Sequence, residues 1–529
     1  MNKHFAIVLL ALLCLFGKLP AQSPTEEKTQ WEAGEAARKK QDWATAVAAY
    51  RRVVELNPNH DEAHAQFVMA SYRTRKPEES DAVRKELFPL YQSWAAKHPR
   101  NAQLQLQLGY LCGTEKSKAE PYFQKAATLD PKLAKAWMEL SLIAEIRGEN
   151  QPRLAYLKKA AEVTPEDPSY LFYYSHAMRE SDPTEYRRLT QTLLKRFPQH
   201  ERAAQALYWL AFETHDLQEK FQTLEQLRRD FPPAKFSWSN SAMDQLFDLH
   251  AQSEPAQALA LAEEMVQLDP KDKDWANKLA MQQNVVRARH LMVERKFAEA
   301  AALLETAAAP RYTYTNALHL MKAEAYDLGG DPTKAFESLL KVVVMEPKDE
   351  LLPALQRYGT KLGKSAAQMS ADMWRGRDEQ AKPFKEFALA KYTGTGNATI
   401  NDYRGKVVLV NFWYPTCGPC RGEFPNLQKA LDKYSARGFV ILAINLEPPE
   451  DDMVLPYLKN NRFGFIPLKS NWEWAKEHYG IRGAPANFLL DQTGRVVFKP
   501  GVIRSEEAHR TFELQIEALL ARGENEQKK

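Results

Sequence analysis

Apolar residues recur every three to four positions through most of the chain between residues 27 and 375. In one such stretch they are Leu154, Leu157, Ala160 and Ala161. That spacing places the apolar side chains along one face of an α-helix. The helical stretches are separated by prolines that stand mostly about 34 residues apart, namely Pro58, Pro99, Pro131, Pro165, Pro198, Pro232, Pro270, Pro310 and Pro347. The pattern predicts a long array of similar helical units.

Small residues at a fixed distance before these prolines support the prediction of repeats. An alanine stands twelve positions before the proline in four of the units, at Ala46, Ala119, Ala298 and Ala335. A small side chain there lets two antiparallel helices approach closely, and the proline ends the second helix. Residues 27–375 therefore resemble tetratricopeptide repeats. The resemblance implies an all-α solenoid whose concave surface binds a protein partner, although the fold does not identify that partner.

The pattern changes after the repeats. A continuous apolar run at 407–413 is typical of a buried parallel strand, and a helical stretch and a second apolar strand at 439–444 follow it. A hairpin is expected at 486–498. Parallel strands, a crossover helix and a final hairpin predict one compact α/β domain. The predicted boundaries are a linker at 376–382, the α/β domain at 383–523 and a charged tail at 524–529.

Two cysteines separated by two residues follow the first of these strands, in the run Cys417-Gly418-Pro419-Cys420. Cys417 stands at the predicted start of a helix, where free backbone N–H groups and the helix dipole favour a thiolate and lower the pKa of the thiol. An exposed Cys417 thiolate can attack a partner disulfide, and Cys420 can then resolve the mixed disulfide. Pro419 fixes the turn between them. The pattern predicts thiol–disulfide exchange, because a zinc site would need a second cysteine or histidine pair and a purely structural disulfide would close almost no loop.

The residues from Val410 to Arg421 resemble the thioredoxin superfamily, in particular its exported TlpA/ResA-like branch, and residues 402–408 are similar to that branch's usual lead-in. The expected fold is therefore an all-α tetratricopeptide solenoid followed by an α/β thioredoxin-like domain. The resemblance places four further residues in the active-site motif, namely Trp413, Thr416, Gly418 and Pro419. It implies no cofactor and no metal beside the redox-active Cys417–Cys420 dithiol.

The resemblance also implies roles for Glu423 and Pro485. Glu423 stands three residues after Cys420 and would tune the cysteine pair and help to move protons during exchange. Taken alone, Glu423 is equally well explained as a first-turn carboxylate that the helix dipole favours. Pro485 is expected to be cis and to expose backbone beside the cysteines, so that a substrate strand can pair with it.

Two positions depart from the family pattern. Thioredoxin carries an aspartate where Asn411 stands, and the TlpA/ResA-like branch often has tryptophan where Thr416 stands. Because Asn411 cannot act as a buried proton acceptor, Glu423 is the better candidate for that step. The smaller Thr416 removes an apolar contact beside Cys417, which is expected to change how substrates dock.

Composition excludes several other classes of protein. The 529 residues include 72 Lys+Arg and 68 Asp+Glu, and the formal charge of +4 is too weak to indicate nucleic acid or a membrane surface as partner. Charged residues at 26% and hydrophobic residues at 44% are ordinary for a soluble globular protein. Four cysteines in the whole chain exclude a scaffold held together by disulfides.

The N-terminal segment predicts export. Residues 1–21 have a short basic start, an apolar run and a small residue, Ala21, at a plausible cleavage point, as in a signal peptide. An uncleaved membrane anchor is the alternative. Cleavage would remove Cys14, whereas Cys112 lies in an apolar helical stretch and is expected to be a buried, unreactive thiol. We therefore expect a periplasmic or other extracytoplasmic location.

The leading functional hypothesis is an exported thiol–disulfide oxidoreductase that reduces the disulfides of client proteins, because its Cys-Gly-Pro-Cys motif resembles that of reducing members of the family. Its partners would be those clients, an upstream membrane or soluble thiol reductant, and a protein on the repeat surface. One alternative is a peroxiredoxin-like peroxidase, although Pro415, Thr416 and Cys417 are consecutive here and not spaced as in the P-x-x-x-T-x-x-C pattern. The other alternative is a repeat scaffold with an accessory redox domain.

Overall fold

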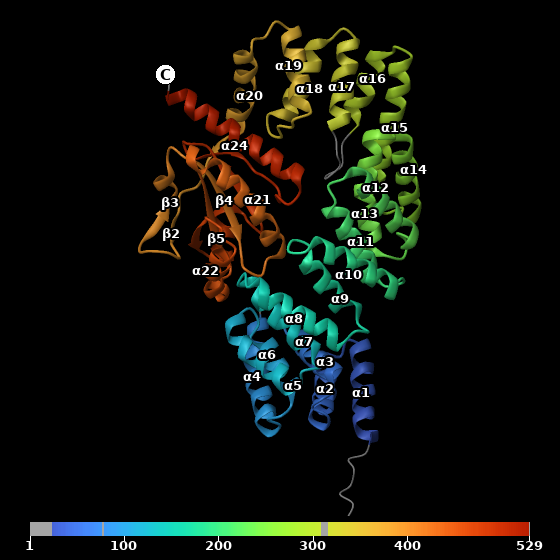
Figure 1. The fold of residues 1–529 in the computed structure, drawn as a ribbon, viewed down its shortest axis with the longest axis vertical. Helices are drawn as coiled ribbons and strands as arrows, with labels where there is room; N and C mark the ends of the chain where they lie inside the picture. The colour runs from blue at the N-terminus through green and yellow to red at the C-terminus, as the bar shows by residue number, and fades with distance from the viewer. Residues whose placement is uncertain (1–23, 77–78, 308–315, 528–529) are drawn as a thin grey trace, which may run out of the picture. The chain divides into compact units, whose positions relative to one another are not determined.

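The computed structural model describes residues 24–76, 79–307 and 316–527. The predicted signal segment, with Cys14, lies outside these residues. A helical part comes first and a mixed α/β part follows it (Figure 1). Contacts divide the chain into two compact units, which are Met1–Ile143 with Glu162–Thr164, and Ala144–Ala161 with Pro165–Lys529. Within the described ranges, no helix combines the length and the apolar character needed to span a membrane.

The helices before the sheet are α1 (Pro24–Lys39), α2 (Trp43–Leu56), α3 (Asp61–Arg73), α4 (Ser80–Lys97), α5 (Ala102–Leu111), α6 (Lys116–Leu129), α7 (Ala134–Ile146), α8 (Asn150–Val163), α9 (Pro168–Met178), α10 (Pro183–Arg196), α11 (Glu201–Glu213), α12 (Leu217–Asp230), α13 (Ser237–Ser253), α14 (Pro255–Leu268), α15 (Lys273–Val293), α16 (Phe297–Thr306), α17 (Asn316–Leu328), α18 (Pro332–Val343), α19 (Leu351–Lys361) and α20 (Ala366–Gln380). The elements after them are β1 (Lys382–Pro383), β2 (Ala388–Ala390), β3 (Asn397–Thr399), η2 (Ile400–Tyr403), β4 (Val407–Trp413), α21 (Gly418–Tyr434), η3 (Ser435–Arg437), β5 (Phe439–Asn445), η4 (Pro448–Glu450), α22 (Asp451–Asn460), β6 (Ile466–Lys469), α23 (Trp472–Tyr479), β7 (Ala486–Leu490), β8 (Arg495–Phe498) and α24 (Glu506–Gln527).

The recurring prolines stop every second helix, as the repeat pattern predicts. They stand two residues beyond the ends of α2, α4, α6, α8, α10, α12 and α14, at Pro58, Pro99, Pro131, Pro165, Pro198, Pro232 and Pro270. Other prolines start helices: Pro168, Pro183 and Pro332 each occupy the first turn after an aspartate whose side chain caps the helix. Pro310 lies outside the described residues. These local signals explain why the helix boundaries follow the sequence closely.

The first unit is helical, and aromatic side chains fill its core. Tyr50, Phe67 and Tyr91 are almost completely buried and belong to one apolar cluster that spans α1 to α5. The buried His64 lies 3.0 Å from the Tyr91 hydroxyl through Nδ1. Burial lowers the pKa of His64 to about 4, so this histidine is neutral at pH 7.

Gly109 in α5 shows how closely two helices pack in this unit. A Cβ atom there would lie 2.3 Å from Cε1 of Phe123 in α6, a side chain with no exposed surface. The substitution Gly109→Ala gains about 1 kcal/mol of helix propensity but overpacks a closed core, which costs about 1–3 kcal/mol. Because 2.3 Å is far below a normal contact distance, the cost falls in the upper part of that range. The net loss of about 1–2 kcal/mol should lower amide hydrogen-exchange protection in α5 and α6 by about 5–30-fold.

The double variant G109A/F123L is the control for this prediction. Leucine at position 123 leaves room for the added methyl group, so the double variant should lose less protection than the two single losses combined. A G109A protein whose α5 and α6 amides stay as protected as those of the parent would contradict the steric argument.

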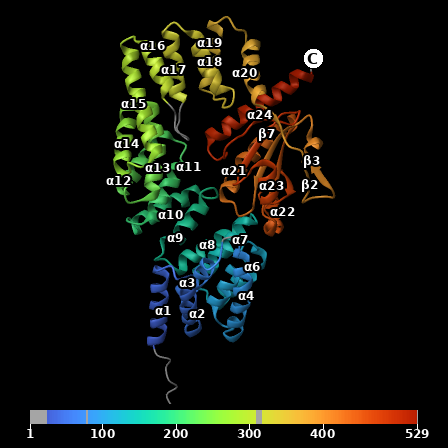
Figure 2. The same ribbon diagram turned by 180° about the vertical axis from the view of Figure 1, so that it is seen from behind.

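The repeat helices of the second unit pack on one another, and the last of them contacts the α/β part of the same unit. Their apolar faces form two clusters, one through α10 to α17 and one through α17 to α20. Figure 2 shows these helices from behind. At the end of the array, Arg377 in α20 is buried and donates to the Val344 carbonyl at 2.9 Å. Its guanidinium also stacks on Phe498 in β8, 5.4 Å from the ring centroid. The last repeat helix therefore packs directly on the sheet.

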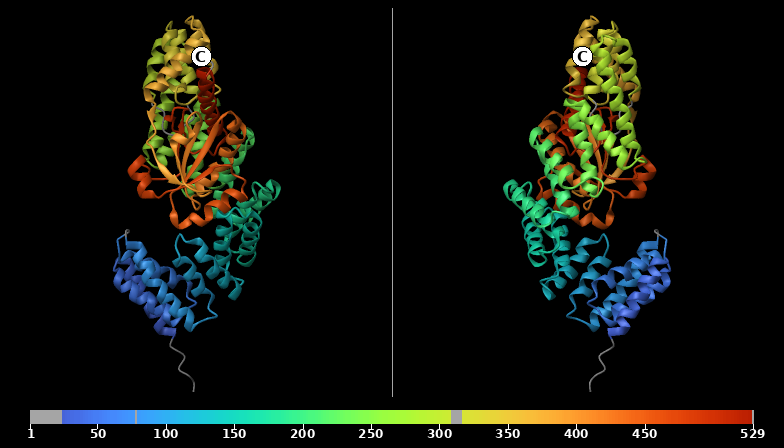
Figure 3. Two further views of the ribbon diagram at one scale, coloured as in Figure 1. Left: turned by 90° about the vertical axis from the view of Figure 1, so that its left-hand side faces the viewer. Right: turned by 90° about the vertical axis from the view of Figure 1, so that its right-hand side faces the viewer.

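The sheet has six strands in the order β1-β8-β7-β4-β5-β6. Its strands are the orange arrows in Figure 3. β4 pairs in parallel with β5 and in antiparallel fashion with β7, and β5 pairs in parallel with β6. β2 and β3 form a separate two-stranded hairpin. β4, β5, β7 and β8 confirm the strands that the sequence predicts at 407–413, 439–444 and 486–498. The expected order, a long helical array followed by an α/β domain, is confirmed.

Side chains alternate between the two faces of the central strand β4, because successive residues of a strand point in opposite directions. Leu409 and Trp413 face a cluster with α21 and α24, whereas Val410 and Phe412 face a second cluster that includes residues of β2 and α23. All seven residues of β4 are buried. The sheet is therefore covered on both sides, and β4 delivers its carboxyl end to the cysteines from a rigid core.

The domain boundaries proposed from the sequence stay predictions. α20 extends through Gln380, so residues 376–380 of the expected linker are helical. β1 then pairs with β8, with Lys382 opposite Val496. At the other end, α24 runs to Gln527 and so includes part of the expected charged tail.

Candidate active site

Cys417 and Cys420 form a disulfide at the junction of β4 and α21, with their Cα atoms 5.3 Å apart. Cys417 is the N-cap residue of α21, and the Cys420 backbone N–H donates to its sulfur at 3.2 Å. A sulfur in this position receives the free N–H groups and the positive end of the helix dipole, which favour a thiolate after reduction. The structure therefore places the pair where the sequence puts it.

The exposure predicted for Cys417 is wrong. Cys417 is 3% exposed and Cys420 is completely buried, whereas Gly418 and Pro419 between them are exposed. The Cys417 sulfur lies 3.8 Å from the carbonyl oxygen of Ala484. Because Gly418 and Pro419 are the exposed residues of this turn, a partner must approach the disulfide over them.

The peptide bond between Ala484 and Pro485 is cis, as the motif predicts. Pro485 lies just before β7, whose first residue is Ala486. The loop brings the Ala484 backbone beside Cys417, where a substrate strand has a carbonyl to pair with. The role assigned to Pro485 stays a prediction.

Glu423 lies one turn after Cys420 on α21 and is completely buried. Its carboxylate accepts hydrogen bonds from the Asn411 side chain at 2.8 Å, the Asn487 side chain at 3.1 Å and the Ile503 backbone N–H at 3.1 Å. Burial raises the pKa of Glu423 to about 7, against the lowering effect of these hydrogen bonds and of Arg504. A carboxyl group with a pKa near neutral pH can both accept and return a proton.

Asn487 and Ile503 are the partners of Glu423 that the sequence reasoning missed. Asn487 is a buried polar residue in β7. An amide side chain within an apolar strand indicates a buried hydrogen-bond partner, and the sequence offered that signal. The Asn487 side chain also accepts from Asn411 at 2.8 Å. Ile503 contributes only a backbone N–H, which no side-chain pattern reveals.

Thr416, at the position where the TlpA/ResA-like branch often has tryptophan, makes polar contacts. Its backbone N–H and its hydroxyl donate to the two carboxylate oxygens of Glu450, at 2.9 and 2.6 Å. Glu450 is 1% exposed and follows β5, beside the carboxyl end of β4. Sequence reasoning missed Glu450, although an acidic residue after a parallel strand is a recognisable signal. This carboxylate fixes the residue that precedes Cys417.

Trp413 closes β4 below the cysteines. It has no exposed surface and packs against Phe424 and Tyr457, with ring centroids 4.8 and 5.7 Å away. Trp413 belongs to the buried apolar cluster that includes both cysteines. It therefore supports the cysteine turn from inside the core and does not contact a substrate.

Cys112 is half-buried and not fully buried as expected. It follows α5, and its thiol donates to the Leu108 carbonyl at 3.4 Å. Burial and the nearby Glu115 raise the pKa of Cys112, so the thiol form prevails at neutral pH. That low reactivity agrees with the expected inert role.

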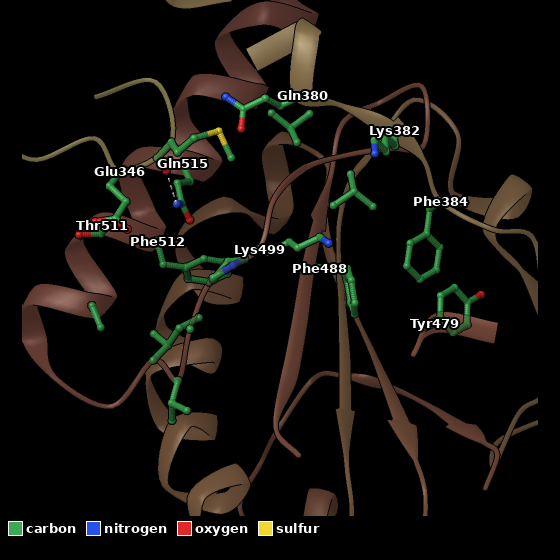
Figure 4. Close-up of a pocket in the computed structure, with 18 of the residues that line it drawn as sticks. Glu346, Gln380, Lys382, Phe384, Tyr479, Phe488, Lys499, Thr511, Phe512 and Gln515 are labelled. Carbon is green, nitrogen blue, oxygen red and sulfur yellow. Dashed lines mark hydrogen bonds between the residues drawn. The ribbon is translucent and has the colours of Figure 1, made fainter. Parts of the chain in front are cut away.

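A cavity of about 700 Å³ in the α/β part and the end of the array does not include the disulfide. Figure 4 shows its aromatic wall, formed by Phe384, Tyr479 and Phe488, with Lys382 and Lys499 near it. A second cavity of about 460 Å³ is lined by Gly418 and Pro419 and therefore lies beside the cysteines. The candidate site is therefore identified by the cysteine pair and not by the volume of a cavity. Among the described residues, no group of three or more His, Cys, Asp or Glu side chains is arranged to hold a metal ion.

Comparisons with known proteins match both parts of the chain. Residues 380–499 match the model of the AhpC/TSA family, and residues 29–60 and 285–350 match tetratricopeptide repeat models. The thiol-disulfide oxidoreductase ResA of Geobacillus thermodenitrificans is 31% identical over 111 residues, which are 21% of this chain and 63% of that protein. The ResA of Geobacillus kaustophilus is 30% identical over 115 residues, which are 22% of this chain and 66% of that protein. The chain thus spans less than two thirds of the length of these curated relatives.

A solved structure, the thioredoxin domain of a thiol-disulfide oxidoreductase from Bacteroides vulgatus, is 25% identical and covers 26% of this chain and 96% of its own, with a TM-score of 0.23. The family models and the ResA relatives confirm the predicted resemblance. The chain combines tetratricopeptide repeats with a C-terminal thioredoxin-like domain that is similar to ResA thiol-disulfide oxidoreductases.

Proposed function

We propose that this protein is an exported thiol–disulfide oxidoreductase that reduces the disulfides of client proteins through Cys417 and Cys420. The observation that carries the proposal is the cysteine pair at the N-terminus of α21, with a buried Glu423 of raised pKa one turn away. The similarity to proteins named thiol-disulfide oxidoreductase supports the same reaction class.

The proposed reaction begins with the reduced protein. The Cys417 thiolate attacks one sulfur of a client disulfide, the client S–S bond breaks, and a Cys417–client mixed disulfide forms. The released client thiolate takes up a proton. Cys420 then loses its proton and attacks the Cys417 sulfur, which forms the Cys417–Cys420 disulfide and releases the second client thiolate. Two electrons pass to the client, and an upstream thiol reductant must restore the dithiol.

We assign the proton transfer of the second step to Glu423, the buried carboxyl group one turn after Cys420 on α21. Its carboxylate accepts the proton of the Cys420 thiol, and the resulting neutral acid protonates the departing client thiolate. The raised pKa makes both states accessible near pH 7. Asn411 and Asn487 hold the carboxyl group in place by hydrogen bonds.

The repeat array is proposed to bind a protein partner, since solenoids of this type present extended concave surfaces. Export rests on residues 1–21, whose pattern predicts a signal peptide. The uncleaved anchor is the alternative for that segment, and mass spectrometry of the mature N-terminus distinguishes the two. A chain that begins after Ala21 supports cleavage, and one that begins at Met1 supports the anchor.

The reduction potential of the cysteine pair tests the direction of the reaction. Equilibration of the full-length protein with glutathione buffers, read out by thiol alkylation, should give a potential at or below about −220 mV, in the range of reducing members of the family. A value near −120 mV, where strong oxidants such as DsbA lie, would contradict client reduction.

Two further assays address the alternative functions. Peroxide consumption with a thiol donor should be negligible, because Pro415, Thr416 and Cys417 are consecutive in this chain. A scaffold with an accessory redox domain would keep its function in cells when Cys417 is replaced by serine, whereas a reductase would lose it.

A further inference from the structure

The cavity beside the disulfide is built jointly by the repeat array and the α/β part. Helices α8, α9 and α11 contribute Arg153, His176 and Trp209, whereas α21 contributes Gly418 and Pro419. All its lining residues belong to the second unit. A volume of about 460 Å³ lies within the usual range for ligand pockets.

Direct contacts hold the repeat helices against this side of the α/β part. Arg421 on α21 donates to Glu145 on α7 at 3.1 Å and to the Pro415 carbonyl at 2.7 Å. The Asn460 side chain on α22 donates to the Arg147 carbonyl at 2.7 Å. These contacts bring a wall of the array next to the only exposed residues of the cysteine turn.

The cavity has an excess of positive charge. Four arginines and two glutamates line it, namely Arg153, Arg179, Arg421, Arg504, Glu145 and Glu180. Both glutamates are engaged: Glu145 pairs with Arg421 and Arg153, and Glu180 pairs with Arg179. Burial and the surrounding arginines lower the pKa of His176 to about 3, which agrees with a positive potential in the cavity.

Arg504 is the arginine of the cavity lining that takes no part in these ion pairs. Its guanidinium stacks on Trp209 and Phe212 of α11, at 5.3 and 5.8 Å from the ring centroids, and the structure gives it no ion pair and no side-chain hydrogen bond to any described residue. On the opposite side it lies over Gly422, where a Cβ atom would come within 2.7 Å of its Nε atom. The array thus holds a half-buried guanidinium against Gly422 in the second turn of α21, one residue before Glu423.

We propose that this cavity binds a client segment that carries an aspartate or glutamate close to the disulfide to be reduced, and that Arg504 recognises that carboxylate. The proposal rests on the proposed function and specifies its substrate class. An arginine fork matches the two oxygens of a carboxylate, and a partly desolvated site strengthens the resulting hydrogen bonds. A client chain in the cavity lies against Gly418 and Pro419, over which it must reach Cys417.

Two peptides that differ only in charge test the proposal. Each contains one disulfide, flanked by two glutamates in one peptide and by two glutamines in the other. We expect the reduced full-length protein to reduce the glutamate peptide with a second-order rate constant about 10–100-fold higher, because charge-assisted hydrogen bonds favour it. The variant Arg504→Gln should lose this preference, so that the ratio of the rate constants for the two peptides falls to about one. The ratio is the measure, because both peptides meet the same Glu423 in each protein. Arg504→Lys should retain part of the preference.

The matched control is Arg437→Gln, which removes the same charge from an exposed arginine that pairs with Glu524 outside the cavity. This variant should keep the full preference for the glutamate peptide. Equal rates for both peptides with the parent protein, an equal loss of preference in the Arg437 variant, or a full preference kept by Arg504→Gln would each overturn the proposal.

A binding measurement separates this proposal from the proposed function. Peptides with serines in place of both cysteines are titrated into the oxidised protein and followed by fluorescence anisotropy. The glutamate peptide should bind about tenfold or more tightly than the glutamine peptide, and Arg504→Gln should abolish the difference. Equal affinities would overturn the docking proposal, whereas failure of the parent to reduce hydroxyethyl disulfide would contradict the reductase function alone.

Discussion

Replacing Cys417 by serine should reduce the rate of client disulfide reduction on the order of 10³-fold or more, because the attacking thiolate is lost. Replacing Cys420 by serine should have a different result. Cys417 can still attack, but the mixed disulfide is no longer resolved from within the chain. The Cys420→Ser protein should therefore accumulate covalent complexes with its clients. Their bands on a non-reducing gel disappear after dithiothreitol and identify the clients by mass spectrometry.

The control for both variants is Cys112→Ser. Cys112 is half-buried with a raised pKa and lies outside the apolar cluster that holds the cysteine pair. This variant should reduce client disulfides at the parent rate and trap nothing. Covalent complexes that form in Cys417→Ser but not in Cys420→Ser would reverse the order of attack derived from the helix N-terminus.

Replacing Glu423 by glutamine should change how the stability of the oxidised α/β part depends on pH. The pKa of Glu423 is about 7 in the folded protein, above its ordinary value of 4.5. The folded state therefore holds a proton that the unfolded state releases between these pH values, and the free energy of unfolding falls as the pH rises through that window. Glutamine does not titrate. The stability of Glu423→Gln relative to the parent should thus rise by about 3 kcal/mol from pH 4.5 to pH 8.

Amide hydrogen exchange in β4 and β7 measures this difference, because these buried strands report the opening of the α/β part and not of the array. The control is Glu473→Gln, which removes a carboxylate exposed on α23 and should leave the difference from the parent constant with pH. A Glu423→Gln difference that is also flat between pH 4.5 and pH 8 would show that Glu423 is not held in its neutral form.

The same variant separates the two explanations of Glu423 that the sequence leaves open. A carboxylate placed only to satisfy the helix dipole would be exposed in the first turn, and its removal would not affect the second exchange step. A proton carrier should instead slow the release of the mixed disulfide when it is replaced, without slowing the attack by Cys417. Stopped-flow measurement of the two steps with one peptide disulfide distinguishes these outcomes.

Local patterns were sufficient for much of this protein. The proline spacing predicts where alternate repeat helices end, because a proline stops a helix through its own backbone and needs no distant partner. The apolar run at 407–413 and the Cys-x-x-Cys pair predict a buried strand that delivers Cys417 to a helix N-terminus, and β4 and α21 confirm this. The thioredoxin-like domain, its cysteine pair and the preceding repeats were therefore determined by the sequence itself.

The surroundings of the cysteines were decided by contacts between residues far apart in the chain. Glu423 accepts hydrogen bonds from residues 64 and 80 positions away, and Thr416 donates to a carboxylate 34 positions away. Burial of Cys417 likewise depends on the loop that brings the Ala484 carbonyl beside it, across 67 residues. Arg421 meets Glu145 of the array across 276 residues. A periodic pattern in the sequence cannot predict these contacts, because they form only when the sheet, the loops and the repeat helices pack together. The pKa of Glu423 and the charged cavity beside the disulfide are therefore properties of the tertiary structure.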